Sequence, residues 1–77
     1  NVSFEEAVTV FYDTEARVVF DEEHSYDEDR FVILGQSRAL RLLVVCHCYK
    51  KQEEKIRIIS ARKATSMEIR QYKNLKE

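Results

Sequence analysis

The 77-residue sequence predicts one α+β domain in which a small antiparallel β-sheet is flanked by an N-terminal and a C-terminal helix. Near each end, a Ser or Thr is followed three residues later by Glu, the capping-box spacing that begins a helix. Between these signals, apolar residues gather in short stretches typical of strands. The connections between those stretches are too short for crossover helices, which predicts a meander of about four antiparallel strands. No interdomain linker is visible in residues 1–77.

The first helix is predicted to begin at Ser3. Its hydroxyl and the Glu6 carboxylate can each satisfy a free backbone N–H of the other. Apolar residues then follow at i, i+3, i+4 and i+7, namely Phe4, Ala7, Val8 and Phe11. This spacing places one apolar stripe along an amphipathic helix of about two and a half turns, which should end near Asp13.

The central segment predicts three strands separated by polar connections. Residues 16–20 form a short strand, residues 21–29 an acidic loop and residues 30–34 a second strand. Gly35, the chain's one glycine, is expected to close that strand in a turn at positive φ. The third and longest strand is expected at residues 40–49.

The last third of the chain predicts a hairpin and a helix. Residues 50–54 form a charged hairpin loop into a fourth strand at residues 55–61. Thr65 and Glu68 then make a second capping box. The helix that they begin is expected to carry four apolar residues among its bases, namely Met67, Ile69, Tyr72 and Leu75.

The net charge of −1 is the sum of two very different halves. Residues 1–35 hold ten acids and two bases, a balance of −8, whereas residues 36–77 hold eleven bases and four acids, a balance of +7. Such a split favours an anionic partner for the second half. The two halves can equally neutralise each other within the fold, and charge alone leaves both interpretations open.

Composition also bears on metals, redox state and location. Cys46 and Cys48 point to the same face of an expected strand, where a disulfide between them would be strained, so reduced thiols are expected. Structural zinc needs four ligands and wider cysteine spacing, so we expect neither a metal nor a cofactor. No apolar run approaches the roughly 20 residues that cross a bilayer, and no leader pattern is visible. We therefore expect a cytoplasmic protein without membrane contact.

Strand periodicity sorts the candidate functional residues by face. In residues 40–49 the even positions are all apolar, so the odd positions are expected to reach solvent. Ile56 and Ile58 are expected to face the core, which turns the odd positions of the fourth strand outward. If the two strands share that face, they form one basic surface bearing His47, Tyr49, Lys55 and Arg57, followed by Arg62 and Lys63.

Such a surface suits RNA cleavage by internal transfer. The RNA 2′-OH attacks the neighbouring phosphorus, so the protein needs a proton acceptor, cations for the phosphate and an acid for the leaving 5′-oxygen. His47 can move that proton near neutral pH, and Tyr49 can stack on a base or orient the phosphate. A histidine on a strand is also often structural, and a tyrosine at a strand end often packs. These alternatives stay open.

Specific residues resemble one known family. They are Val2 to Ala7, Glu28 with Arg30, Gly35 to Ser37, Leu42 to Val45 with His47, and Arg57 to Thr65 with Glu68 and Tyr72. Together they closely resemble the BrnT toxin family over nearly the whole sequence. The Arg-Ile-Ile-Ser-Ala-Arg run at residues 57–62 before a Thr-capped helix is the most specific part.

The resemblance implies a RelE-like fold and a metal-independent endoribonuclease that inhibits translation. It also implies a BrnA-like antitoxin with a ribbon-helix-helix DNA-binding part, through which alone the toxin would reach operator DNA. On that basis the catalytic residues are His47, Arg57 and Arg62, with Arg30 on the RNA phosphates. Tyr49, Lys55 and Lys63 complete the expected RNA-binding surface.

Two further expectations concern the start of the sequence and its activity. Members of the family usually begin with a short strand and a helix before the Ser-Phe-Glu-Glu segment, whereas this sequence begins at Asn1. Residues 1–77 are therefore expected to be one toxin domain that lacks these elements. The alternative to a ribonuclease is a non-catalytic module that only forms a DNA-binding complex with an antitoxin.

Overall fold

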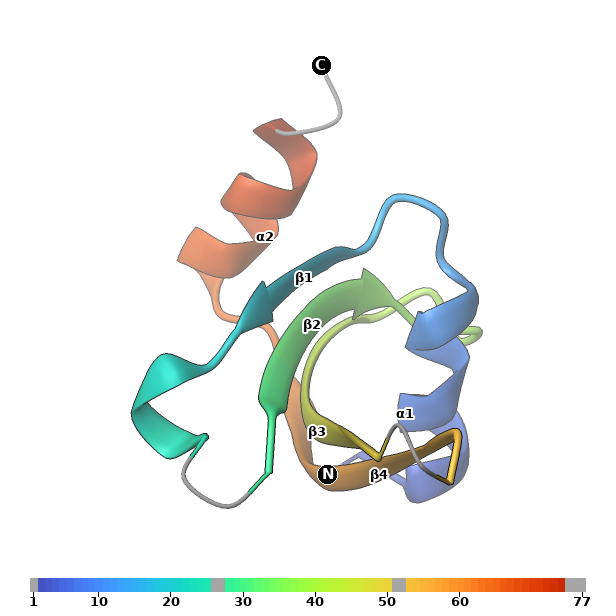
Figure 1. Cartoon of the computed structure of the whole chain (residues 1–77). Helices are drawn as coiled ribbons and strands as arrows, with labels where there is room; N and C mark the ends of the chain where they lie inside the picture. Colours follow the sequence, from blue (N-terminus) through green and yellow to red (C-terminus); the bar gives the residue numbers. More distant parts are fainter. Residues whose placement is uncertain (1, 26–27, 51–52, 75–77) are drawn as a thin grey trace.

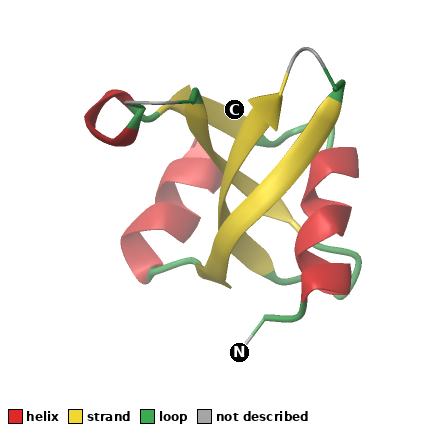
Figure 2. Ribbon diagram, turned by 60° about the horizontal axis from the view of Figure 1, so that its bottom comes forward, coloured by secondary structure: helices red, strands yellow, loops and turns green. Residues whose placement is uncertain are grey.

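The fold is a four-stranded antiparallel sheet with a helix on each face (Figures 1 and 2). The computed structural model describes residues 2–25, 28–50 and 53–74. The sheet order β1-β2-β3-β4 follows the chain, so the predicted meander and the α+β class are confirmed. The elements are α1 (Phe4–Thr9), η1 (Val10–Tyr12), β1 (Arg17–Phe20), η2 (Glu22–His24), β2 (Arg30–Gln36), β3 (Leu42–Lys50), β4 (Lys55–Lys63) and α2 (Ser66–Asn74).

Three expectations about these elements change in detail or stay open. β2 and β4 each continue two residues beyond their predicted ends, and β3 begins two residues later than predicted. Parts of the acidic loop and of the hairpin loop, residues 26–27 and 51–52, lie outside the described residues, as does Leu75. The RelE-like label stays a prediction. In the described part of the chain, no helix is long and apolar enough to cross a membrane.

Both helices begin where the capping spacing predicts. The Glu6 N–H donates to Ser3 Oγ at 3.0 Å. At the second helix the box is reciprocal, because the Glu68 N–H donates to Thr65 Oγ1 at 3.2 Å and the Thr65 N–H donates to Glu68 Oε1 at 2.8 Å. These bonds satisfy backbone donors that the first turn of a helix leaves without a partner.

The Glu6 carboxylate does not complete the first box but joins α1 to the connection between β2 and β3. Ser37 Oγ donates to Glu6 Oε2 at 2.6 Å, and Arg41 Nε donates to the same oxygen at 2.8 Å. The Arg41 hydrogen bond, followed by that of Ser37, lowers the Glu6 pKa to about 2. This charge-assisted contact holds α1 in place against the sheet.

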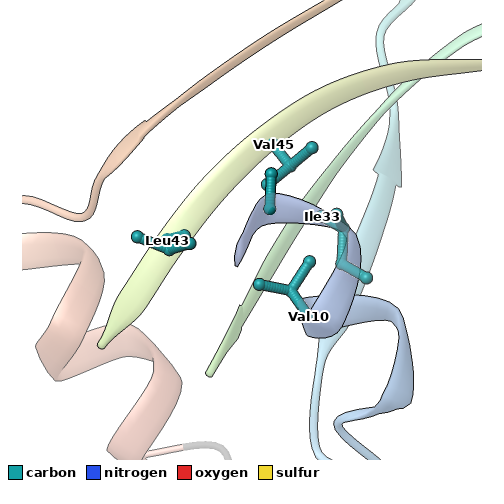
Figure 3. Close-up of a cluster of buried hydrophobic side chains, with 5 residues drawn as sticks. Val10, Ile33, Leu43 and Val45 are labelled. Atoms are coloured by element: carbon teal, nitrogen blue, oxygen red, sulfur yellow. The ribbon is translucent and has the colours of Figure 1, made fainter. Parts of the chain in front are cut away.

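The hydrophobic core lies between α1 and one face of the sheet. Its buried members are Ala7, Val10, Ile33, Leu43 and Val45. Figure 3 shows Val10 from η1 directed toward Ile33 of β2, with Leu43 and Val45 along β3. The expectation that the odd face of this strand reaches solvent is therefore wrong for Leu43 and Val45, whereas Tyr49, near the end of the strand, is 41% exposed.

The register of β3 and β4 shows which residues of the two strands share a face. Lys50 pairs with Lys55 and Cys48 with Arg57, so near the hairpin an even position of β3 lies beside an odd position of β4. The even face of β3 is therefore continuous with Lys55 and Arg57, whereas His47 shares its face with Ile58. A shift of one residue in register exchanges the two faces of a strand, and periodicity within one strand does not reveal it.

Gly35 has a different role from the predicted one. It lies inside β2 and its φ is not positive, whereas Leu40 and Glu54 have positive φ values of 65° and 50°. A Cβ at Gly35 would lie 3.1 Å from Ala16 Cβ and 3.3 Å from Val10 Cβ. The residue is small because Val10 of η1 and Ala16, the residue before β1, lie directly against it.

We expect Gly35→Ala to lower the free energy of unfolding by about 1–3 kcal/mol, since overpacking a core costs that much. Urea denaturation measures the loss. The loss should shrink in an Ala16→Gly background, because that change removes the Cβ that the new methyl group meets at 3.1 Å. An unchanged midpoint for Gly35→Ala would contradict this account.

Candidate functional site

The face of the sheet opposite α1 carries a row of bases. In the register, Cys48 of β3 lies between Arg30 of β2 and Arg57 of β4. Further along the same face, Arg62 of β4 lies beside Val44. We call this surface the arginine face and define it by Arg30, Lys55, Arg57 and Arg62.

Two of its arginines are paired with carboxylates of the same chain. Arg57 donates to Glu28 Oε1, and Arg62 binds Glu68 with two hydrogen bonds of 2.9 Å each. The side chains of Arg57 and Arg62 are 57% and 55% exposed. Each guanidinium therefore keeps donors that face solvent while its position is held by an acid.

These contacts favour the charged forms of the arginines and of Glu68. Hydrogen bonding to Cys48, and then the charge of Glu28, raises the Arg57 pKa above its usual range. Hydrogen bonding to Glu68 raises the Arg62 pKa in the same way. The Glu68 pKa falls to about 2, first because of Arg62 and then because of the Thr65 N–H.

Arg30 differs from the other two arginines. It is half-buried, and its Nε lies out of contact with water. Within residues 2–25, 28–50 and 53–74, this nitrogen has no hydrogen-bond partner. A buried donor without a partner is costly, so the Arg30 side chain is held here at the expense of one unmade hydrogen bond.

His47 lies on the other side of the sheet, between Phe11 of η1 and Phe31 of β2. It is 5% exposed, with its ring edge-on to Phe11 at 4.8 Å between centroids and stacked on Phe31 at 5.8 Å. Burial lowers the His47 pKa, and its Nδ1 is 3.4 Å from the Val45 carbonyl oxygen. The expected surface that joins His47 and Tyr49 with Lys55 and Arg57 is therefore wrong.

The seven residues selected from the sequence thus divide between two faces. Arg62 and Lys63 are neighbours in the chain but point to opposite sides, and Lys63 helps to lower the Glu6 pKa on the α1 side. On the arginine face lie Arg30, Lys55, Arg57 and Arg62, and on the α1 side lie His47, Tyr49 and Lys63. The roles assigned to these residues stay predictions.

Sequence reasoning missed Glu28 as a member of the site. It noted the Glu28-x-Arg30 pair but assigned no role to the acid. Glu28 reaches Arg57 across 29 residues of chain, a contact with no local pattern that could reveal it. The sequence indicates only the thiol chemistry of Cys48, because its place between Arg30 and Arg57 depends on the strand register.

An open groove of about 510 Å³ lies beside the arginine face, between α2 and the sheet. Val32, Leu34 and Val44 form its apolar floor, and Glu68 stands at its rim.

Cys46 and Cys48 are both free thiols. Among the side chains that the structure describes, no group of three or more His, Cys, Asp or Glu could hold a metal ion.

The family is decided by a comparison of the sequence. The model of the ribonuclease toxin BrnT of type II toxin-antitoxin systems matches residues 1–68. This chain belongs to the BrnT family. The matched residues include the whole sheet and the arginine face. No curated protein matches the chain.

Membership of the BrnT family confirms the resemblance drawn from residues 57–65. The protein is a ribonuclease toxin of a type II toxin-antitoxin system, and an antitoxin is the partner that such a system implies. Among the four members of the arginine face, three are arginines on two different strands, which is the chemistry that binds phosphate bidentately.

We expect the burial of His47 to make stability depend on pH. Because its folded pKa is below the ordinary 6.5, the unfolded chain binds more protons, and the free energy of unfolding falls as pH drops from 6.5 toward the folded pKa. Denaturation at pH 7 and pH 5 should show a smaller loss for His47→Phe than for the wild type. Equal losses in the two proteins would contradict this, since carboxylates and His24 are common to both.

Proposed function

We propose that this BrnT toxin is a metal-independent endoribonuclease that binds RNA on the arginine face and so inhibits translation. The observation that carries the proposal is the placement of Arg30, Arg57 and Arg62 on one face of the sheet, the face that also carries α2. Adjacent strands lie about 4.8 Å apart, so guanidinium groups on β2 and β4 can reach one phosphate from both sides of β3. Arg62 extends the same charge toward α2.

The chemistry that fits this surface is attack by the 2′-OH of the RNA itself. Negative charge builds up on the phosphate oxygens as the pentacoordinate transition state forms. Preorganised arginines stabilise that charge more than the charge of the bound substrate, which is the condition for catalysis. Lys55 supplies a further cation near the hairpin, and the apolar groove beside Val44 offers a wall for a base.

The partner in this proposal is a BrnA-like antitoxin with a ribbon-helix-helix DNA-binding part. It neutralises the toxin in the cytoplasm, and the toxin reaches operator DNA only through it. Type II systems pair a protein toxin with a protein antitoxin, which supports the partner class. In this proposal RNA binds Arg57 and Arg62, and an acidic segment of the antitoxin covers the same two residues.

A second candidate function is a non-catalytic module that binds only the antitoxin. The burial of His47 favours it, because the proton-transfer group expected from the sequence is 5% exposed. The two functions differ in one product, cleaved RNA.

The first experiment incubates purified protein with a defined RNA in EDTA. We expect fragments that end in a 2′,3′-cyclic phosphate, because the 2′-oxygen remains bonded to phosphorus after internal transfer. The same RNA with 2′-deoxyribose throughout should stay intact, since it lacks the nucleophile. Intact RNA in both reactions would favour the non-catalytic module.

The second experiment replaces Arg57 and Arg62 singly by Ala. We expect each change to lower the cleavage rate about tenfold or more, because a hydrogen bond to a charged group contributes about 1.5–3 kcal/mol. Arg38→Ala is the matched control, since it removes the same charge from an exposed turn away from this face. Equal losses in all three variants would show a nonspecific effect of charge.

A further inference from the structure

The arginine face holds two carboxylates whose contacts differ. Glu68 binds Arg62 through both oxygens, and its Oε1 also accepts the Thr65 N–H that begins α2. Glu28 contacts Arg57 through Oε1, and its side chain is 26% exposed. Glu68 therefore has structural contacts at both oxygens, whereas the contact of Glu28 among the described residues is with Arg57 of the arginine face.

We propose that Glu28 is the proton acceptor that activates the RNA 2′-OH; this inference rests on the proposed ribonuclease function. Glu28 lies against Arg57, so a phosphate bound by Arg57 brings its neighbouring ribose to this carboxylate. His47, the acceptor expected from the sequence, is on the opposite face and buried. The low Glu68 pKa, about 2, makes that group a poor base.

The ion pair also explains how Glu28 is kept in place before RNA arrives. In the free protein Arg57 donates to Glu28. When RNA binds, the phosphate competes for the same guanidinium, and the carboxylate is released next to the ribose that it must deprotonate. Arg57 thus binds the Glu28 carboxylate first and the phosphate afterwards. Binding of the phosphate thereby frees Glu28 to accept the proton of the 2′-OH.

The reaction balances with Glu28, the RNA and water alone. Glu28 takes the proton of the 2′-OH, and the 2′-oxygen forms a bond to phosphorus. The bond between phosphorus and the 5′-oxygen breaks, and its electron pair stays on that oxygen, which takes a proton from water. The products are a 2′,3′-cyclic phosphate and a 5′-hydroxyl, and the Glu28 carboxyl group returns its proton to solvent.

The test compares Glu28→Gln with the wild type in two assays on the whole chain. We expect single-turnover cleavage to fall about 100-fold or more, which is the usual contribution of a general base. Affinity for a 2′-deoxy analogue of the RNA should stay equal or increase, because the variant removes a negative charge that competes for Arg57. Glu28→Asp keeps a carboxylate and should cleave faster than Glu28→Gln.

Glu5→Gln is the control, since it makes the same chemical change at an exposed position of α1, on the opposite side of the sheet from the arginine face. Undiminished cleavage by Glu28→Gln would overturn the inference, as would a parallel loss of analogue binding and cleavage, which indicates a structural role. Equal rates for Glu28→Asp and Glu28→Gln would also overturn it. If the wild type itself cleaves no RNA, the proposed function fails instead.

Discussion

The arrangement of the site depends on one β-bulge between Cys46 and His47. Arg57 and Arg62 are five residues apart in β4, and on a regular strand an odd separation places side chains on opposite faces. Arg57 pairs with Cys48 on one side of the bulge, and Arg62 pairs with Val44 on the other side. Both arginines therefore lie beside even positions of β3. Bulges commonly redirect side chains next to functional sites, and this one gathers the cations of the arginine face.

Hydrogen bonds between segments far apart in the sequence connect α2, Asp13 and β2. Tyr72 of α2 donates its hydroxyl to Asp13 Oδ2 at 2.7 Å, and the Gln36 N–H donates to the same oxygen at 2.8 Å. Burial, followed by the contact with Asp13, raises the Tyr72 pKa to about 12, so the hydroxyl remains a donor. This contact ties α2 to the end of β2 and keeps Glu68 beside Arg62.

The acidic half of the chain has two uses that its charge does not distinguish. Glu6 binds Arg41 to support α1, whereas Glu28 binds Arg57 on the arginine face. The two halves of the chain therefore partly neutralise each other within the fold, which was one of the two interpretations of the charge split. The other also has support, because Arg57 and Arg62 remain more than half exposed despite their acids.

Local signals in the sequence were sufficient for the elements, because capping, alternation and short connections depend on neighbours in the chain. They predicted both helix starts, the antiparallel meander and, through the run at residues 57–65, the BrnT family. They could not place His47, because its face depends on pairing with β4 and on packing by Phe11. The role predicted for Gly35 was wrong for a similar reason, since the crowding comes from Val10 and Ala16, which are distant in the sequence. The sequence by itself determined which elements form, and only the tertiary structure decided which side chains meet, because strand register and long-range ion pairs leave no local pattern.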